Sequence, residues 1–99
     1  MEFNELSPEI LDKASNMLKA IAHPVRIAIV SFLEKGDKHT VTEIHKKLGI
    51  EQSVASHHLV ILRDRGILSS EREGKNIYYF LRNPNLGKML KSLGDCCKE

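Results

Sequence analysis

Apolar residues recur at helical spacing over the first part of the chain. Ser7, Pro8 and Glu9 stand at its start and supply a helix cap, a proline suited to the first turn and an early acid. The pattern therefore predicts an amphipathic helix over about residues 7–22. The apolar positions are Leu6, Ile10, Leu11, Ala14, Met17, Leu18 and Ile21.

A second helix is expected directly after His23-Pro24. A residue that precedes proline avoids the helical conformation, whereas the proline itself can begin a helix. The run VRIAIVSFLEK that follows is apolar around most of its circumference, which is typical of a buried helix. This segment is predicted to form the centre of the domain, through Val25, Ala28, Ile29, Val30, Phe32 and Leu33.

Residues 42–65 show the pattern of two helices joined by a short turn. Val41 is expected to be extended, and Thr42 to cap a brief helix, EIHKKL, that ends at Gly49. A longer amphipathic helix begins two residues later and ends before Gly66. This is the helix-turn-helix pattern, whose second helix can enter a DNA major groove, although helical hairpins of this size are also common packing units.

The last third of the chain predicts a hairpin and a final helix. ILSSERE and NIYYFL are separated by Gly74-Lys75, which indicates a two-stranded wing over about residues 67–82. Asn83-Pro84 then supplies a cap and a first-turn proline for a helix over about residues 84–97. Its apolar stripe consists of Leu86, Met89, Leu90 and Leu93.

Together these elements predict a mainly α fold with a small β-hairpin, a winged helix-turn-helix, as one domain over residues 1–99. The first and last helices, about 7–22 and 84–97, each retain an apolar stripe. We expect these stripes to form a homodimer, because a chain of 99 residues gains much from extra burial. The alternative is that both helices complete the core of the monomer.

Composition narrows the class of protein. No apolar run approaches the roughly 18 residues of a membrane span, and MEFNELSPEI lacks the basic start and apolar stretch of a signal peptide. We therefore expect a cytoplasmic protein with no membrane partner. Cys96 and Cys97 are adjacent and are not a disulfide framework, so reduced thiols are expected. The net charge of +2 is too small by itself to indicate nucleic acid.

Two neighbouring histidines in the second helix of the helix-turn-helix point in different directions. Each residue advances about 100° around a helix, which places His57 with Ser53 and Ser56, and His58 beside the apolar face. Hydroxyls and an imidazole suit hydrogen bonds to base edges or phosphates, although an exposed helix residue needs no such role. A metal site at the pair is disfavoured, because helical ligands usually sit three or four residues apart.

Basic and polar residues are placed where they would meet a duplex. Lys46 lies on the first helix of the motif, and Arg72 and Lys75 lie on the hairpin. The alternative for these charges is a solvated face with interspersed acids such as Glu71. Glu51 stands at the cap of the second helix, where glutamate caps less well than serine or aspartate, and it is predicted to turn away from DNA because it would repel phosphate. The predicted DNA-binding set is Gln52, Ser53, Ser56, His57, Arg63, Arg72, Lys75, Asn76 and Lys46.

Three consecutive stretches resemble the ArsR/SmtB family of winged-helix repressors: LKAIAHPVRIAIVSFLEKG, TVTEIHKKLGIEQSVASHHLVILRDRGIL and SSEREGKNIYYFL. The resemblance is close over about residues 18–81. It implies a homodimer held by its first and last helices, with each recognition helix in the major groove of a palindromic operator.

The sequence departs from this family at the positions where family members sense their signals. VTEIHKKL has no cysteine, and NPNLGKMLKSLGDCCKE has neither histidine nor the carboxylate-histidine spacing of zinc sensors. Ser31 stands at the position where thiol-sensing members have a cysteine. For Cys96 and Cys97 three readings stay open: residues of a frayed terminus, a redox switch, or soft-metal ligands.

The sequence contains no nucleophile elbow, phosphate loop, zinc-protease helix or paired carboxylates in a predicted cleft. We therefore expect no enzyme activity, cofactor, metal or small-molecule substrate. The predicted function is a homodimeric transcriptional repressor that binds a palindromic operator in double-stranded DNA sequence-specifically, with a response to thiol oxidation at Cys96 and Cys97 as an option. The alternative is a winged-helix protein-interaction module without sequence-specific DNA binding.

Overall fold

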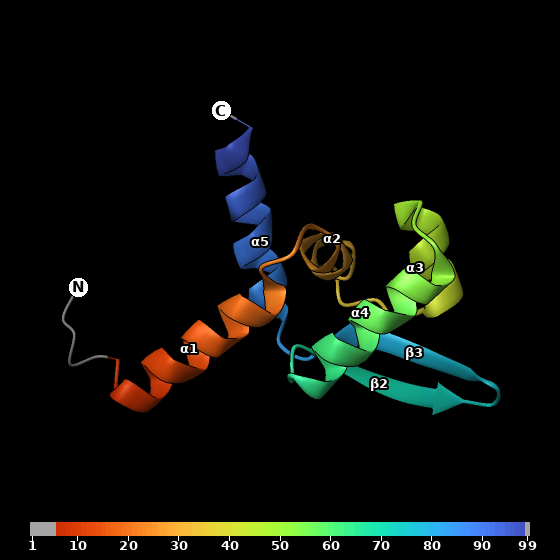
Figure 1. Cartoon of the computed structure of the whole chain (residues 1–99), viewed down its shortest axis with the longest axis horizontal. Helices are drawn as coiled ribbons and strands as arrows, with labels where there is room; N and C mark the ends of the chain where they lie inside the picture. The colour runs from red at the N-terminus through yellow and green to blue at the C-terminus, as the bar shows by residue number, and fades with distance from the viewer. Residues whose placement is uncertain (1–5, 99) are drawn as a thin grey trace.

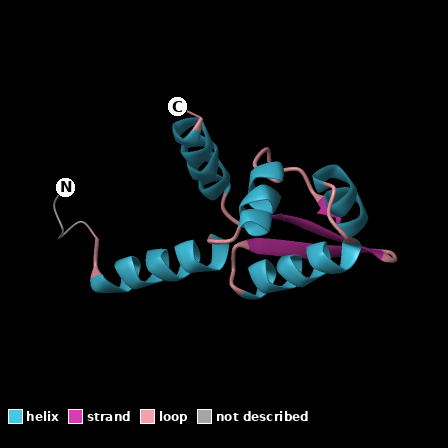
Figure 2. Cartoon of the chain, turned by 45° about the horizontal axis from the view of Figure 1, so that its top comes forward, coloured by secondary structure: helices cyan, strands magenta, loops and turns pink. Residues whose placement is uncertain are grey.

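Five helices and three short strands make up residues 6–98, the part of the chain that the computed structural model describes (Figure 1). Helices α2, α3 and α4 gather at the sheet, and the β2–β3 hairpin extends beyond them as a wing (Figures 1 and 2). The predicted winged helix-turn-helix is confirmed. In chain order the elements are α1 (Pro8–Ile21), α2 (Pro24–Phe32), β1 (His39–Thr40), α3 (Val41–Leu48), α4 (Gln52–Asp64), β2 (Leu68–Glu73), β3 (Asn76–Leu81) and α5 (Pro84–Cys97).

Three helices begin at the prolines that the sequence predicts, each after a polar cap, of which His23 was not predicted to act as one. The side chains of Ser7, His23 and Asn83 each accept a hydrogen bond from a first-turn amide, at 3.2, 3.1 and 3.0 Å. Such amides have no partner within their own helix, and a proline in the first position has no amide to satisfy. The starts of α1, α2 and α5 are therefore determined locally.

The predicted start of the helix-turn-helix is wrong by one or two residues. Thr40, not Thr42, caps α3: its hydroxyl accepts from the Glu43 amide at 3.2 Å, and the Glu43 carboxylate accepts from the Thr40 amide at 2.9 Å. This reciprocal capping box satisfies two amides at once, so the helix begins at Val41, which is not extended. The hydrogen bond from the Thr40 amide is also the main cause that lowers the pKa of Glu43.

The wing is part of a three-stranded antiparallel sheet with the order β1-β3-β2. In the hairpin, Leu68 pairs with Leu81 at the base and Glu73 pairs with Asn76 at the tip. The short strand β1, which the sequence pattern did not predict, pairs its His39 with Tyr79 of β3. It connects the entrance of α3 to the wing, and so holds the two parts of the DNA-binding motif together.

Helix α2 lies at the centre of the core, as predicted. Ile29, Val30 and Leu33 have no exposed surface, whereas Val25 and Phe32 are half-buried and pack against the core from its edge. The other fully buried large side chains come from α3, α4 and the start of β2. They are Ile44, Leu59, Leu62, Ile67 and Leu68.

Helices α1 and α5 project from this body (Figures 1 and 2). Ala20 and Ile21 are the buried residues of α1, whereas Leu18 is 55% exposed and Leu93 of α5 is 51% exposed. The radius of gyration, 14.4 Å, exceeds the roughly 13 Å of a compact domain of this length because of these arms. Within one chain the apolar stripe of α1 is thus largely uncovered, whereas that of α5 is covered in part: Leu86 and Leu90 are buried, and Met89 and Leu93 are exposed. Within residues 6–98, no helix has the length and apolar character to cross a membrane.

Candidate nucleic-acid interface

One face of α4 is polar and open to solvent. Ser53, His57 and Val60 are exposed, and Ser56 is half-buried beside them. The hydroxyls of Ser53 and Ser56 and the imidazole of His57 make no side-chain hydrogen bond to other described residues, so these groups are available to an outside partner. The opposite face supplies core residues without exposed surface, namely Ala55, Leu59 and Leu62.

The predicted division of the histidine pair is confirmed. His57 is exposed, whereas His58 is 8% exposed and is the one buried polar side chain among residues 6–98. The two ring centroids are 5.2 Å apart with the ring planes at 68°. Although the rings touch, the two side chains lie in different surroundings, because successive residues are rotated by about 100° around the helix axis.

His58 lies in a basic cluster that the sequence pattern did not reveal. Arg26 Nε donates to His58 Nδ1 at 3.1 Å, and the ring of His23 lies 4.5 Å from the ring of His58. Burial is the first cause that lowers the pKa of His58, followed by the charges of His23, Arg26 and His57. These surroundings therefore favour the neutral form of His58.

The turn between α3 and α4 begins at a glycine. Gly49 ends α3 in the left-handed conformation, with φ of 66°, which a residue with a side chain adopts at a cost. Glu51 occupies the cap position of α4 and makes no side-chain cap hydrogen bond. This agrees with the weak capping expected of glutamate, whereas its orientation toward DNA stays a prediction.

The remaining predicted contacts of the helix-turn-helix differ in availability. Lys46 and Gln52 are exposed. Arg63 is half-buried, and its Nη2 lies 3.2 Å from Oδ1 of Asp64. Because Asp64 already neutralises Arg63, a phosphate there would have to share or displace the carboxylate.

The wing carries its basic residues at the tip. Arg72, Lys75 and Asn76 are all exposed, and Arg72 Nε donates to the Gly74 carbonyl at 3.4 Å. The left-handed Gly74, with φ of 62°, makes the turn. Lys38 contacts both strands of the wing: its ammonium pairs with Glu71 and lies 5.1 Å from the ring centroid of Phe80. The predicted wing residues thus lie together at the tip of the hairpin, which extends beyond the helices (Figure 1).

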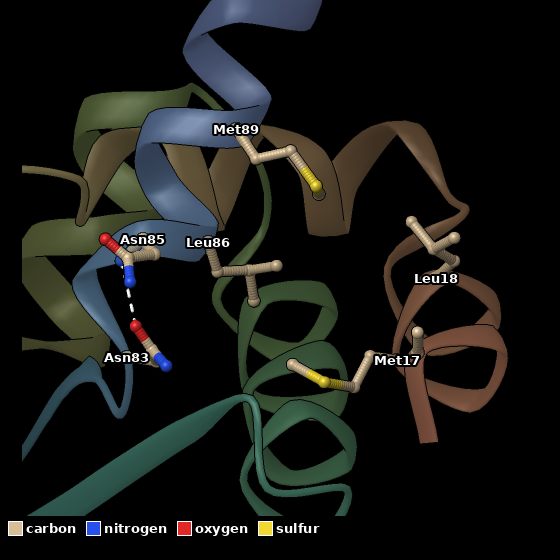
Figure 3. A pocket seen from close by; sticks show the side chains of 7 residues that line it. Met17, Leu18, Asn83, Asn85, Leu86 and Met89 are labelled. Atoms are coloured by element: carbon tan, nitrogen blue, oxygen red, sulfur yellow. Dashed lines mark hydrogen bonds between the residues drawn. The ribbon is translucent and has the colours of Figure 1, made fainter. Parts of the chain in front are cut away.

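An apolar groove separates α1 from the start of α5 (Figure 3). Its volume is about 280 Å³, and Met17 and Leu18 face Leu86 and Met89 across it. Asn83, which caps α5, lies at one end. The groove therefore lies between the two predicted dimerisation helices, α1 and α5.

Cys96 and Cys97 are both exposed, at the end of α5. The residues on either side of the two cysteines form an ion pair, Lys98 with Asp95, at 3.9 Å. Within residues 6–98, no three His, Cys, Asp or Glu side chains gather as metal ligands would.

Comparison with known proteins identifies the family of the chain. Residues 21–71 match the family described as "Helix-turn-helix domain". The chain is 39% identical over 82 residues to the HTH-type transcriptional repressor SmtB of Mycobacterium tuberculosis, covering 83% of this chain and 60% of that protein. It is 37% identical over 83 residues to the transcriptional repressor PagR of Bacillus anthracis, covering 84% of this chain and 83% of that repressor. The chain belongs to the ArsR/SmtB family of winged helix-turn-helix regulators.

Solved structures of ArsR/SmtB relatives share the fold. The repressor BigR from Xylella fastidiosa superposes with a TM-score of 0.81 at 30% identity, covering 94% of this chain and 93% of that one. The PagR structure gives 0.78 at 36% identity, covering 88% and 99%. The family match ends within β2 and begins at the last residue of α1, so both projecting helices lie almost entirely outside it.

Proposed function

We propose that this ArsR/SmtB family member is a transcriptional repressor that binds a palindromic operator in double-stranded DNA as a homodimer. The observation that carries the proposal is the polar face of α4, where Ser53 and His57 are exposed and their side chains make no hydrogen bond within residues 6–98. In a helix-turn-helix, residues near the start of the second helix contact base edges. The repressor names of the relatives support the same function.

In this proposal, α4 enters the major groove. Ser53, Ser56 and His57 hydrogen-bond base edges, and Gln52 in the first turn joins them. Lys46 approaches the phosphates beside the groove, and Arg63 does so from the other end of α4. The polar face of α4 would thus read the bases, and the basic residues on either side of it would position the helix on the phosphates.

The wing tip would contact the adjacent minor groove. Arg72 and Lys75 are exposed cations at the end of a hairpin, and a narrow minor groove attracts such charges through its negative potential. Asn76 offers an amide at the same tip. The wing therefore adds affinity, mostly through phosphates and groove shape.

Dimerisation would use the apolar side chains of α1 and α5 that stay exposed within one chain. Leu18 and Leu93 are each about half exposed, and Met89 opens onto the groove between the helices. A second copy of the chain would bury these side chains, at about 25 cal/mol for each Å² removed from water. A two-fold axis between the subunits would then place the recognition helices on half-sites about one helical turn, or a multiple of it, apart.

A mobility-shift titration on palindromic promoter fragments tests this function. We expect tight binding to one palindrome, an affinity that falls steeply with salt, and a large loss for the double variant Ser56→Ala with His57→Ala. Ser31→Ala, an exposed serine on α2, is the matched control and should bind like the parent.

Two outcomes would contradict the proposal. Equal affinity for the palindrome and for scrambled DNA would refute sequence-specific binding, and protein binding without duplex binding would favour the interaction module. If the Ser56→Ala, His57→Ala variant bound as the parent does, the assignment of the reading residues would be wrong.

A thiol response is proposed for Cys96 and Cys97. Both are exposed on the helix proposed for dimerisation, where a bond between subunits would alter the relation of the two recognition helices. With a peroxide as oxidant, two thiols lose two hydrogens to form one disulfide, and the peroxide is reduced to water or alcohol. We expect peroxide to change operator affinity in the parent and not in the Cys96→Ser, Cys97→Ser variant. Equal responses would refute this regulation and leave DNA binding untouched.

A further inference from the structure

Arg26 of α2 joins the end of α1 to the recognition helix. Its Nη1 donates to the carbonyl oxygen of Ala20 at 2.9 Å, and its Nε donates to His58 Nδ1 at 3.1 Å. One guanidinium therefore contacts the last turn of α1 and the middle of α4. Because the guanidinium is planar and its donors diverge in fixed directions, the two contacts constrain each other.

The contact with Arg26 specifies the protonation state of His58. A guanidinium can only donate, so Nδ1 must present its lone pair and the neutral ring must carry its proton on Nε2. A charged imidazole has a proton on both nitrogens. It would place an N–H, and a second positive charge, opposite the Nε–H of Arg26, and the hydrogen bond would be lost.

The surroundings of His58 offer nothing to neutralise such a charge. The titratable groups that face it are His23 from the α1–α2 junction, Arg26 from α2 and His57 from α4. No carboxylate within residues 6–98 pairs with any of these four side chains. Nδ1 of His23 already accepts the Val25 amide, so that ring too presents a lone pair in this arrangement. The lowered pKa of His58 agrees with this geometry.

We propose that Arg26 is a positioning residue for DNA recognition: its hydrogen bonds to Ala20 and to neutral His58 fix the orientation of α4 relative to α1. Protonation of His58 breaks its hydrogen bond with Arg26, and α4 is then free to change that orientation. The inference rests on the proposed function, because its consequence is a change in operator binding. Since α1 belongs to the proposed dimer surface, the contact links the geometry of the dimer to the angle of the recognition helix. Acid would then weaken operator binding through His58, whereas added positive charge elsewhere would strengthen it.

The test compares operator affinity at about pH 7.5 and about pH 5.5, at one ionic strength. In His58→Asn an amide oxygen can still accept from Arg26 and does not titrate. We expect the ratio of the acidic to the neutral Kd to be roughly fivefold larger in the parent than in His58→Asn. The Arg26→Gln variant should bind the operator more weakly than the parent at neutral pH. Its ratio of the acidic to the neutral Kd should be as small as that of His58→Asn. His39→Asn, which removes a histidine outside the cluster, should keep the ratio of the parent.

A second arm uses the free protein, with circular dichroism to verify that it stays folded at both pH values. On acidification, NMR amide resonances of residues 20–22 and of α4 should shift together in the parent, whereas in Arg26→Gln those of residues 20–22 should stay fixed. Equal Kd ratios in the parent and His58→Asn, or unmoved resonances of residues 20–22 in the parent, overturn the inference. If the parent binds no operator at neutral pH, the proposed function fails instead, and the NMR arm alone decides this inference.

Discussion

Gly87 of α5 lies so close to Glu34, just after α2, that a β-carbon on Gly87 would be 2.9 Å from the Glu34 Cα. The same β-carbon would be 2.9 Å from Cδ1 of Leu81. Real contacts of this kind are not found below about 3 Å, because the repulsion between atoms rises steeply. A backbone atom cannot swing aside as the end of a long side chain can. The absence of a side chain at residue 87 therefore fixes how closely α5 packs on the body before it projects.

Gly87→Ala should lower the free energy of unfolding by about 1–3 kcal/mol, because α5 must shift away from the backbone at Glu34. Gly94→Ala is the matched control on the same helix. Apart from the backbone of α5 itself and the adjoining residues, no atom of the described chain lies within 4 Å of its added β-carbon, so the better helix propensity of alanine should raise stability by up to about 1 kcal/mol. Urea denaturation of both variants measures the difference. Equal effects of the two substitutions would show that the close approach does not matter.

Thr40→Ala should destabilise the fold by about 1 kcal/mol, because it removes the hydroxyl that accepts the Glu43 amide at the start of α3. Thr42→Ala provides the control: Thr42 is exposed and two residues inside the helix, where alanine is favourable by a few tenths of a kcal/mol. Thermal unfolding of the pair gives the comparison. A larger loss of stability for Thr42→Ala than for Thr40→Ala would show that Thr42 is the cap, as the sequence pattern predicted.

The stability of the fold should decrease in mild acid because of His58. Its pKa in the folded protein is lowered, so the unfolded chain takes up the proton first as the pH falls. The contribution of His58 is therefore complete above its ordinary pKa of about 6.5 and is lost as the pH falls through the lower folded value. Urea midpoints of the parent should fall more than those of His58→Asn between about pH 7.5 and about pH 5.5. Parallel pH profiles would contradict the assignment.

Leu18→Lys and Met89→Lys should each convert the proposed dimer to monomer, because a charge would have to be buried in the interface between subunits. Ile77→Lys is the control, since Ile77 is 41% exposed on the wing, about as much as Met89 at 42%, and lies outside the proposed dimer surface. Sedimentation velocity reports the mass of each variant. A dimeric Leu18→Lys, Met89→Lys double variant would place the interface elsewhere.

Local signals explain why much of this fold is predictable. Helix starts at Pro8, Pro24 and Pro84 follow from a cap and a proline next to each other in the chain, and helical periodicity separates the exposed His57 from the buried His58. The misplaced start of α3 also had a local signal, the spacing of Thr40 and Glu43 as a capping box, which the expected extended Val41 obscured.

The sequence by itself determined the order and type of the main elements, the family, and which face of α4 is open, because these depend on residues within a few positions of one another. Tertiary structure alone decided that β1 joins the wing, that Arg26 meets His58 across 32 positions, and that Gly87 fits against Glu34. Such contacts depend on the angles at which whole helices pack. Spacing along the chain carries little information about those angles, because they follow from the shape of the entire core.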